Sequence, residues 1–155
     1  MEAVQRARIG ILSDPGIGGR RAAQGRNKGG SQLRIVLIGQ QAFGKSVLEA
    51  IFDAGKDEVA GVFCSPDQEG RPEDPLKAGA QERSVPVFQP GRFRSAEAIE
   101  QFVGLSPDLC VMAYVTDIVP MEMIEAPTHG TIQYHPSLLP LHRGPSSINW
   151  PIIMG

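Results

Sequence analysis

The sequence predicts an α/β fold in which a parallel sheet carries helices on both faces. From Arg34 onward, short apolar runs alternate with segments that have helical spacing. The apolar runs are continuous, as in strands buried on both faces, and the strand–helix–strand order implies right-handed crossovers between parallel strands. A chain of 155 residues corresponds to one domain of ordinary size.

Local signals place the elements of this fold. The first helix ends near Gly55, Ser95 precedes a helix that has acidic residues in its first turns, and Pro120 suits the start of a short helix. The expected elements, in chain order, are strand 35–39, helix 46–52, strand 58–64, helix 76–82, strand 85–88, helix 95–103, strand 108–115, helix 120–124 and strand 130–134.

The charge is divided unevenly along the chain. Residues 1–33 carry six Lys and Arg against two acids, and residues 34–155 carry nine against fifteen, within a net charge of −2. The start is rich in Gly and Arg and has only one short apolar patch, which is too little to offset the entropy of ordering it. We therefore expect a basic, mobile arm over 1–32 and a folded domain over 33–155.

Three interpretations of the arm stay open: an extended start without function, an organelle presequence, or a basic arm that contacts nucleic acid. It lacks the pattern of a secretory signal and is poor in Ser for a transit peptide. The acidic body lacks the basic surface of a domain that wraps nucleic acid.

Composition and the length of the apolar runs predict that the chain does not span a membrane. Hydrophobic residues make up 41% and charged residues 21% of the chain, and no apolar run approaches the roughly 18 residues of a spanning helix. Cys64 and Cys110 lie inside apolar runs, where small buried thiols are expected and a reducing compartment fits. We expect a cytoplasmic protein, or a mitochondrial one if the arm is a presequence.

Three loops should meet at the carboxyl ends of the strands, where open parallel sheets bind ligands. They are 39–44, 113–120 and 135–147. The first loop lacks the third glycine of a dinucleotide-binding fingerprint, so its glycines serve helix packing or its amides line a ligand. In the third loop, His135 precedes a proline and is therefore held extended at the end of a strand. An imidazole there can share a proton or stabilise an oxyanion near neutral pH.

The segment His-Pro-Ser-Leu-Leu-Pro at 135–140, followed by Arg-Gly at 143–144, resembles the signature of the folate-dependent formyltransferase family. The resemblance runs from about Arg34 to Gly155. It is greatest to the hydrolase domain of 10-formyltetrahydrofolate dehydrogenase, and it extends to methionyl-tRNA formyltransferase. It implies a Rossmann-like parallel sheet that is incomplete at its C-terminal side. Further matching segments are 38–40, 43–44, 61–63, 66–67, 118–122, 126–127, 129–130, 134–135 and 147–150.

The resemblance implies transfer of a formyl group from 10-formyltetrahydrofolate to an amine or to water, without a metal. His135 matches the catalytic histidine of the family. Gln133 stands where many members have Asn, and its amide either faces the oxyanion or is structural. A cis peptide bond is implied at 139–140. The expected folate contacts are Met112, Ala113, Tyr114, Val115 and Thr116, whose backbone would hold the pterin ring, together with Ser137, Leu138 and Arg143.

The catalytic Asp of the family lies about three dozen residues beyond its histidine, whereas this sequence ends twenty residues after His135. We expect that Asp outside these 155 residues and expect the chain alone to be inactive. Asp117 is a poor substitute because it follows the strand that holds the pterin. The formyl acceptor stays open, and a tRNA acceptor would need a region beyond Gly155. The alternatives are a sugar-nucleotide formyltransferase and a non-catalytic module that binds folate or a nucleotide.

The other candidate residues are weaker. His129 precedes a strand at the opposite end of the sheet, which favours a structural role. His142 either orders its loop or faces solvent. Ser137 and Ser146 lack the context of a nucleophilic serine, and no His/Cys cluster has the spacing of a metal site.

Overall fold

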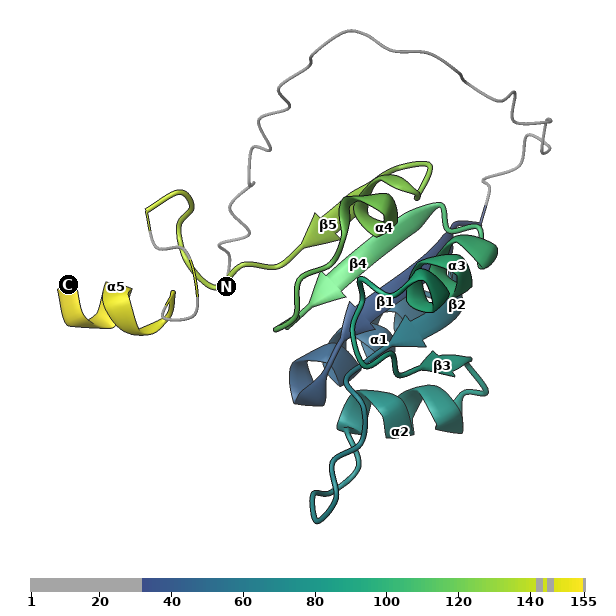
Figure 1. Cartoon of the computed structure of the whole chain (residues 1–155), viewed down its shortest axis with the longest axis horizontal. Coiled ribbons are helices and arrows are strands. Elements are labelled where there is room, and N and C mark those ends of the chain that lie inside the picture. The colour runs from purple at the N-terminus through teal and green to yellow at the C-terminus, as the bar shows by residue number, and fades with distance from the viewer. Residues whose placement is uncertain (1–31, 142–143, 145–146, 155) are drawn as a thin grey trace, which may run out of the picture. The chain divides into compact units, whose positions relative to one another are not determined.

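The computed structural model describes residues 32–141, 144 and 147–154 (Figure 1). Apart from Gln32, the expected basic arm lies outside the described residues and stays a prediction. Among the described residues, no helix combines the length and the apolar character needed to cross a membrane.

Five parallel strands form one sheet in the order β3-β2-β1-β4-β5 (Figure 1). The strands are β1 (Arg34–Gly39), β2 (Glu58–Phe63), β3 (Val87–Phe88), β4 (Leu109–Ala113) and β5 (Thr131–Gln133). The chain first moves outward from β1 to β3 and then returns to place β4 on the other side of β1. The strand order therefore reverses between β1 and β4, which is where such sheets bind ligands.

The helices are α1 (Gln41–Ala54), α2 (Pro75–Glu82), α3 (Ala96–Gly104), α4 (Met121–Glu125) and α5 (Asn149–Met154). Their ends carry the expected signals: the Ser95 hydroxyl accepts from the Ala98 amide, and Gly55 ends α1 with a φ of 60°. The predicted α/β fold is thus confirmed, with most boundaries within two residues of the prediction.

The start of α1 was predicted wrongly. The helix begins at Gln41, five residues before the predicted start, so the expected loop over 39–44 is reduced to a short turn. Gln40, its N-cap residue, provides no side-chain cap. Instead, the Asp74 carboxylate, from a distant part of the chain, accepts a hydrogen bond from the Gln41 backbone amide. A cap supplied from elsewhere in the fold leaves no local signal in the sequence.

Two apolar clusters cover the two faces of the sheet. One is centred on Phe63, Phe102 and Met123 and lies on the side of α3 and α4. The other is centred on Leu37, Leu48 and Leu76 and lies on the side of α1 and α2. The continuous apolar runs of β1 and β2 thus reflect burial on both faces, as predicted.

Gly39 permits the close approach of β1 to β4. A Cβ atom at this position would lie 2.5 Å from the carbonyl oxygen of Ala113, well inside van der Waals contact. The glycine therefore sets the spacing of the two strands between which the sheet order reverses. This role is strand packing and not the helix packing that the sequence suggested, and the alternative in which amides of this turn line a ligand stays a prediction.

Candidate functional site

A polar pocket of about 680 Å³ lies at the carboxyl ends of β1, β2 and β4. Gln40 follows β1, Ser65 follows β2, and Tyr114 and Thr116 follow β4. The loop that leads to α2 supplies the rest of the lining, including three carboxylates, at Asp67, Glu73 and Asp74, and the guanidinium of Arg71. The pocket therefore occupies the place where the strand order reverses.

Gln40 links the three loops of this pocket. Its side chain is buried, with 8% of the residue exposed. Its amide Nε2 donates to the Thr116 hydroxyl at 3.2 Å, and its Oε1 accepts from the Ser65 hydroxyl at 2.6 Å. Because both ends of the amide are paired, the loops after β1, β2 and β4 are held together. The sequence analysis missed this role, for which the one signal is a polar residue directly after a buried strand.

Asp74 is a second residue that the sequence analysis missed. Both of its carboxylate oxygens lie 2.9 Å from the Gln41 amide, and Oδ1 also accepts from the Leu76 amide at 2.8 Å. One carboxylate therefore caps α2 locally and α1 from a distance. Gln41 has a φ of 60°, in the left-handed region that disfavours residues other than glycine, and this contact helps to hold it there.

Lys77 neutralises two of the acidic side chains around the pocket. Its ammonium group lies 2.5 Å from an oxygen of Asp67 and 3.1 Å from an oxygen of Glu73. The hydrogen bond from Lys77 lowers the pKa of Asp67, with a smaller contribution from the Gln89 amide. The same contacts, first with Asp67 and then with Glu73, raise the pKa of Lys77. The ammonium group of Lys77, on α2, is therefore paired with carboxylates of the loop that precedes this helix.

His135 follows β5, the strand next to β4 at one edge of the sheet. The Tyr134 amide donates to the Met112 carbonyl at 3.2 Å, which keeps the chain on β4 up to the residue before the histidine. Nδ1 of His135 lies 3.4 Å from the Ser137 amide and 3.0 Å from the Ser137 hydroxyl. Since the backbone amide can only donate, this contact favours the tautomer that carries its hydrogen on Nε2.

The segment expected to hold a pterin ring divides into two parts. Met112 and Ala113 are buried in the two apolar clusters, and their carbonyls accept from the Tyr134 and Gln40 amides. Tyr114 and Thr116 are exposed and line the polar pocket, and Val115 between them is half-buried. The part of this segment that a ligand can reach is therefore Tyr114 to Thr116.

The remaining predicted residues are more scattered. Gln133 is an exposed residue at the end of β5 and pairs with Met112 across the sheet. Ser137 contacts His135, whereas Leu138 is 80% exposed. The peptide bond between Leu139 and Pro140 is cis, as the resemblance implied. Three further residues of this loop, His142, Arg143 and Ser146, lie outside the described residues.

Asp117 is held by two backbone amides, one from its own loop and one from the segment before α3. One of its oxygens accepts from the Ile118 amide at 2.7 Å and the other lies 3.4 Å from the Phe93 amide. His129 lies at the opposite end of the sheet from His135, and its amide donates to the Asp108 carbonyl at 2.7 Å. Neither residue lines the polar pocket.

The two cysteines are buried free thiols, as predicted. Burial, and then the charge of Asp74, raise the pKa of Cys64 to about 12. Burial raises the pKa of Cys110 to about 12, although a hydrogen bond with Thr131 acts in the opposite direction. Within the described part of the chain, no group of three or more His, Cys, Asp or Glu residues could hold a metal ion.

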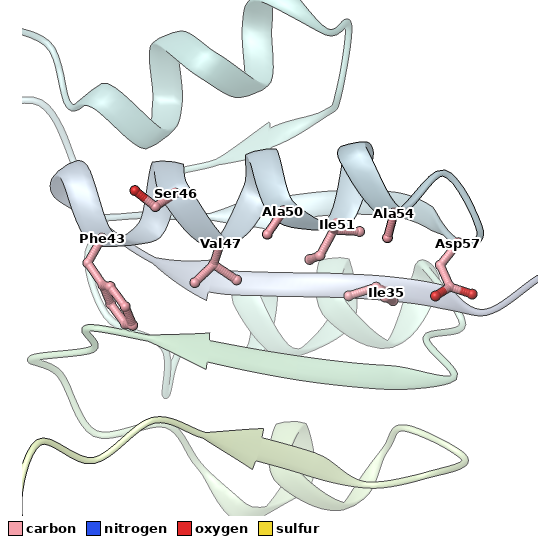
Figure 2. Close-up of a pocket in the computed structure, with 8 residues that line it drawn as sticks. All are labelled: Ile35, Phe43, Ser46, Val47, Ala50, Ile51, Ala54 and Asp57. Atoms are coloured by element: carbon pink, nitrogen blue, oxygen red, sulfur yellow. The ribbon is translucent and has the colours of Figure 1, made fainter. Parts of the chain in front are cut away.

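A second hollow, of about 440 Å³, has a different character (Figure 2). It lies along α1, where Val47, Ala50 and Ile51 point toward β1. Its lining is mainly apolar, with Ser46 and Asp57 near its two ends. It offers few polar groups to orient a small substrate, so we take the polar pocket as the candidate site. Of the three loops expected to meet, those after β1 and β4 line this pocket, whereas the described residues of the His135 loop line neither hollow.

Comparison with known proteins gives a single family. The family model described as formyl transferase matches residues 33–155. The chain is 42% identical over 130 residues to the mitochondrial 10-formyltetrahydrofolate dehydrogenase of Mus musculus, covering 81% of this chain and 14% of that protein. It is 38% identical over 128 residues to the methionyl-tRNA formyltransferase of Alkaliphilus oremlandii, covering 79% of this chain and 41% of that protein.

Solved structures agree on the fold. A formyltetrahydrofolate deformylase from Pseudomonas syringae superposes with a TM-score of 0.65 at 18% identity, covering 81% of this chain and 43% of that chain. A phosphoribosylglycinamide formyltransferase from Bacillus halodurans superposes with a TM-score of 0.63 at 22% identity, covering 79% of this chain and 66% of that chain. The chain thus spans about one seventh of the dehydrogenase and two thirds of the smaller formyltransferase. By its sequence, this chain belongs to the formyl transferase family.

Proposed function

We propose that this chain forms the formyl-donor side of an enzyme that moves a formyl group from 10-formyltetrahydrofolate to an amine or to water. The observation that carries the proposal is His135, which lies at the carboxyl edge of the sheet with Nδ1 held by Ser137. That contact leaves Nε2 as the hydrogen-bearing nitrogen, which suits a donor to a developing oxyanion.

The reaction adds an amine nitrogen or a water oxygen to the formyl carbon and gives a tetrahedral intermediate. In our proposal the Nε2 hydrogen of His135 stabilises its oxyanion, and the Gln133 amide is a second donor. The bond from carbon to N10 of the folate then breaks, and N10 takes a proton. An Asp outside these 155 residues would manage the proton of the attacking group.

Donor binding is assigned to the loop after β4. Tyr114, Val115 and Thr116 offer backbone groups next to apolar walls, which suits a flat amide-containing ring such as the pterin. The Gln40 side chain fixes Thr116 at 3.2 Å and so orders this loop before the ligand arrives. Ser137, Leu138 and Arg143, from the sequence that follows β5, are further proposed contacts of the donor.

Binding of a stable 10-formyl folate analogue tests the donor site directly. We expect the 155-residue chain to bind the analogue and Thr116→Val to weaken binding, because the valine cannot accept from Gln40. Asp53→Asn is the matched control, since Asp53 is an exposed residue near the end of α1, away from the pocket. Equal binding by the Thr116 variant and the control would contradict this assignment.

A test of turnover also needs the Asp that we propose as the proton-managing group. We suggest a chimera in which residues 33–155 continue into the segment that follows the matched region of the methionyl-tRNA formyltransferase from Alkaliphilus oremlandii. Formyl release from 10-formyltetrahydrofolate should be measurable in the chimera and absent in the 155-residue chain. His135→Ala in the chimera should lower turnover by about 100-fold or more, as the loss of one oxyanion donor does. Analogue binding without turnover in a folded chimera would favour the non-catalytic module.

We also propose that the protein acts in the cytoplasm, where buried free thiols such as Cys64 and Cys110 persist. The mitochondrial alternative depends on residues 1–32. A fluorescent fusion of the full chain, compared with one lacking residues 1–32, tests it. Import that depends on the arm would replace the cytoplasmic assignment.

A further inference from the structure

A buried amide in the wall of the polar pocket fixes the direction in which two hydroxyl groups point their hydrogens. The amide belongs to Gln40, which is 8% exposed and lies between Ser65 and Thr116. Its Oε1 lies 2.6 Å from the Ser65 hydroxyl, and its Nε2 lies 3.2 Å from the Thr116 hydroxyl. The two distances differ enough to show which way the amide is turned.

The orientation of the amide follows from the lengths of these two contacts. Hydrogen bonds from a hydroxyl to an oxygen are about 2.5–3.0 Å long, and those from an amide N–H to an oxygen are about 2.7–3.2 Å long. The 2.6 Å contact therefore fits the Ser65 hydroxyl as donor to Oε1, and the 3.2 Å contact fits the amide N–H as donor to Thr116. The opposite orientation would place an N–H donor at 2.6 Å from Ser65, which is too short.

Both partners of the amide are held by further contacts. The Ser65 carbonyl accepts from the Gln89 side chain at 2.8 Å. The carboxylate of Asp117, next to Thr116, lies 3.4 Å from the Phe93 amide of the segment before α3. Because the loops after β2 and β4 are both tied to other parts of the fold, the amide keeps its orientation before a ligand binds.

The two hydroxyls are left with different hydrogen-bonding capacity. A hydroxyl donates one hydrogen and has two acceptor positions. Ser65 has given its hydrogen to Gln40, whereas Thr116 accepts from Gln40 and keeps its own hydrogen. Among the described residues, no group accepts that hydrogen. Thr116 is exposed and lines the pocket, so its hydroxyl hydrogen is available to a ligand there.

We propose that Thr116 is a specificity-determining residue that donates a hydrogen bond to the ring carbonyl of the formyl donor. The inference rests on the proposed function, in which the loop from Tyr114 to Thr116 holds the folate ring. The carbonyl oxygen at C4 is the strongest acceptor of that ring. A ring with an amine at C4 would turn a donor toward the Thr116 donor, and both hydrogens would lack a partner.

Two forms of the stable 10-formyl folate analogue test the proposal, one with the carbonyl at C4 and one with an amine there. The readout is the carbonyl preference, defined as the dissociation constant of the amine form divided by that of the carbonyl form. Thr116→Val removes the hydroxyl, and Thr116→Ser keeps it. Gln40→Glu replaces the amide N–H by a second acceptor, which draws the Thr116 hydrogen away from the pocket. Asp53→Asn is the matched control at an exposed position away from the pocket.

We expect the unchanged chain, Asp53→Asn and Thr116→Ser to prefer the carbonyl form by about 10-fold, the value of one net hydrogen bond. Thr116→Val should remove this preference, and Gln40→Glu should lower it by at least as much. Dividing the two constants cancels any general weakening of the loop, because such weakening affects both forms alike. A folded Thr116→Val chain that keeps the carbonyl preference would overturn the proposal, and so would a Thr116→Ser chain that loses it.

The same measurements separate this inference from the proposed function. If the unchanged chain binds neither form, the assignment of the donor site fails and this inference fails with it. If the unchanged chain binds both forms and Thr116→Val weakens them equally, the donor site stands and the role of the Thr116 hydrogen is wrong.

Discussion

The two halves of the sheet differ in how their faces are covered. In β1 and β2, the residues from Val36 to Ile38 and from Val59 to Phe63 are buried, with α1 and α2 on one face and α3 on the other. In the half made of β4 and β5, Cys110 and Met112 are buried, but Ile132 is 48% exposed and Tyr134 is 58% exposed.

The difference shows that burial follows helix cover and not residue type. Ile132 is as apolar as Ile38, which is 1% exposed, yet it lies on an edge strand that is paired on one side only. The polar pocket lies where the well-covered β1 meets β4, and His135 follows the less covered β5. The candidate residues therefore lie partly on the well-covered half of the sheet and partly on the less covered half.

The largest expected effect on stability comes from a pair of large-to-small substitutions, one in each half of the sheet, that tests the difference in burial. Phe102 is fully buried and packs 5.6 Å from Phe63, measured between ring centroids. Phe102→Ala should lower the free energy of unfolding by about 4 kcal/mol, and Ile132→Ala by about 1 kcal/mol or less. Urea unfolding of both variants measures the difference.

Phe102→Leu serves as a control if the alanine variant does not fold, and should cost about 1 kcal/mol. Similar losses from Phe102→Ala and Ile132→Ala would mean that the two halves are equally packed. The contrast drawn from exposure would then be wrong.

The junction between the halves gives the next largest effect. A Cβ at Gly39 would lie 2.5 Å from the Ala113 carbonyl oxygen, and two paired strands cannot separate easily at that point. Gly39→Ala should therefore destabilise the protein by about 2 kcal/mol. Gly91→Ala is the matched control, since no atom lies within 4 Å of its added Cβ. If both glycine variants unfold at the same urea concentration, the strands do not depend on this contact.

The two buried cysteines allow the interiors of the two halves to be compared through the pH dependence of stability. The pKa of Cys110 on β4 is raised to about 12 in the folded state, from a reference value of 9.0. Between pH 9 and 12 the unfolded thiol loses its proton and the folded one keeps it, so stability falls as pH rises. At pH 10 the loss is about 1.4 kcal/mol for this thiol.

Cys110→Ala should reduce the fall in stability between pH 8 and pH 10 by that amount. Cys64→Ala, at the end of β2, should also reduce the fall, because the pKa of Cys64 is likewise raised to about 12. An effect for Cys64 and none for Cys110 would show that water reaches the interior next to β4.

The sequence was sufficient for the fold and for part of the site. Continuous apolar runs predicted the buried strands, and Ser95 and Gly55 predicted helix ends, because these signals are local. Contacts between distant segments were not predictable. Gln40 meets Ser65 and Thr116 across 25 and 76 residues of sequence, and Asp74 reaches Gln41 across 33. Both depend on strand order, which a single sequence does not encode locally.

The smallest expected effect concerns the contact that ties the two halves together next to the candidate site. The rings of Phe43 on α1 and Tyr134 after β5 lie 4.9 Å apart, between centroids, at a tilt of 52°. Both rings are partly exposed, so we expect a coupling energy near 0.5 kcal/mol, at the low end for aromatic pairs. Phe43→Leu, Tyr134→Leu and the double variant form the double-mutant cycle that measures this energy.

Hydrogen exchange at the Tyr134 amide gives a second measurement. This amide donates to the Met112 carbonyl, and its exchange should quicken in both single variants, because the contact between the two rings stabilises the chain just before His135. Additive losses together with unchanged exchange would show that β4 alone positions the His135 loop.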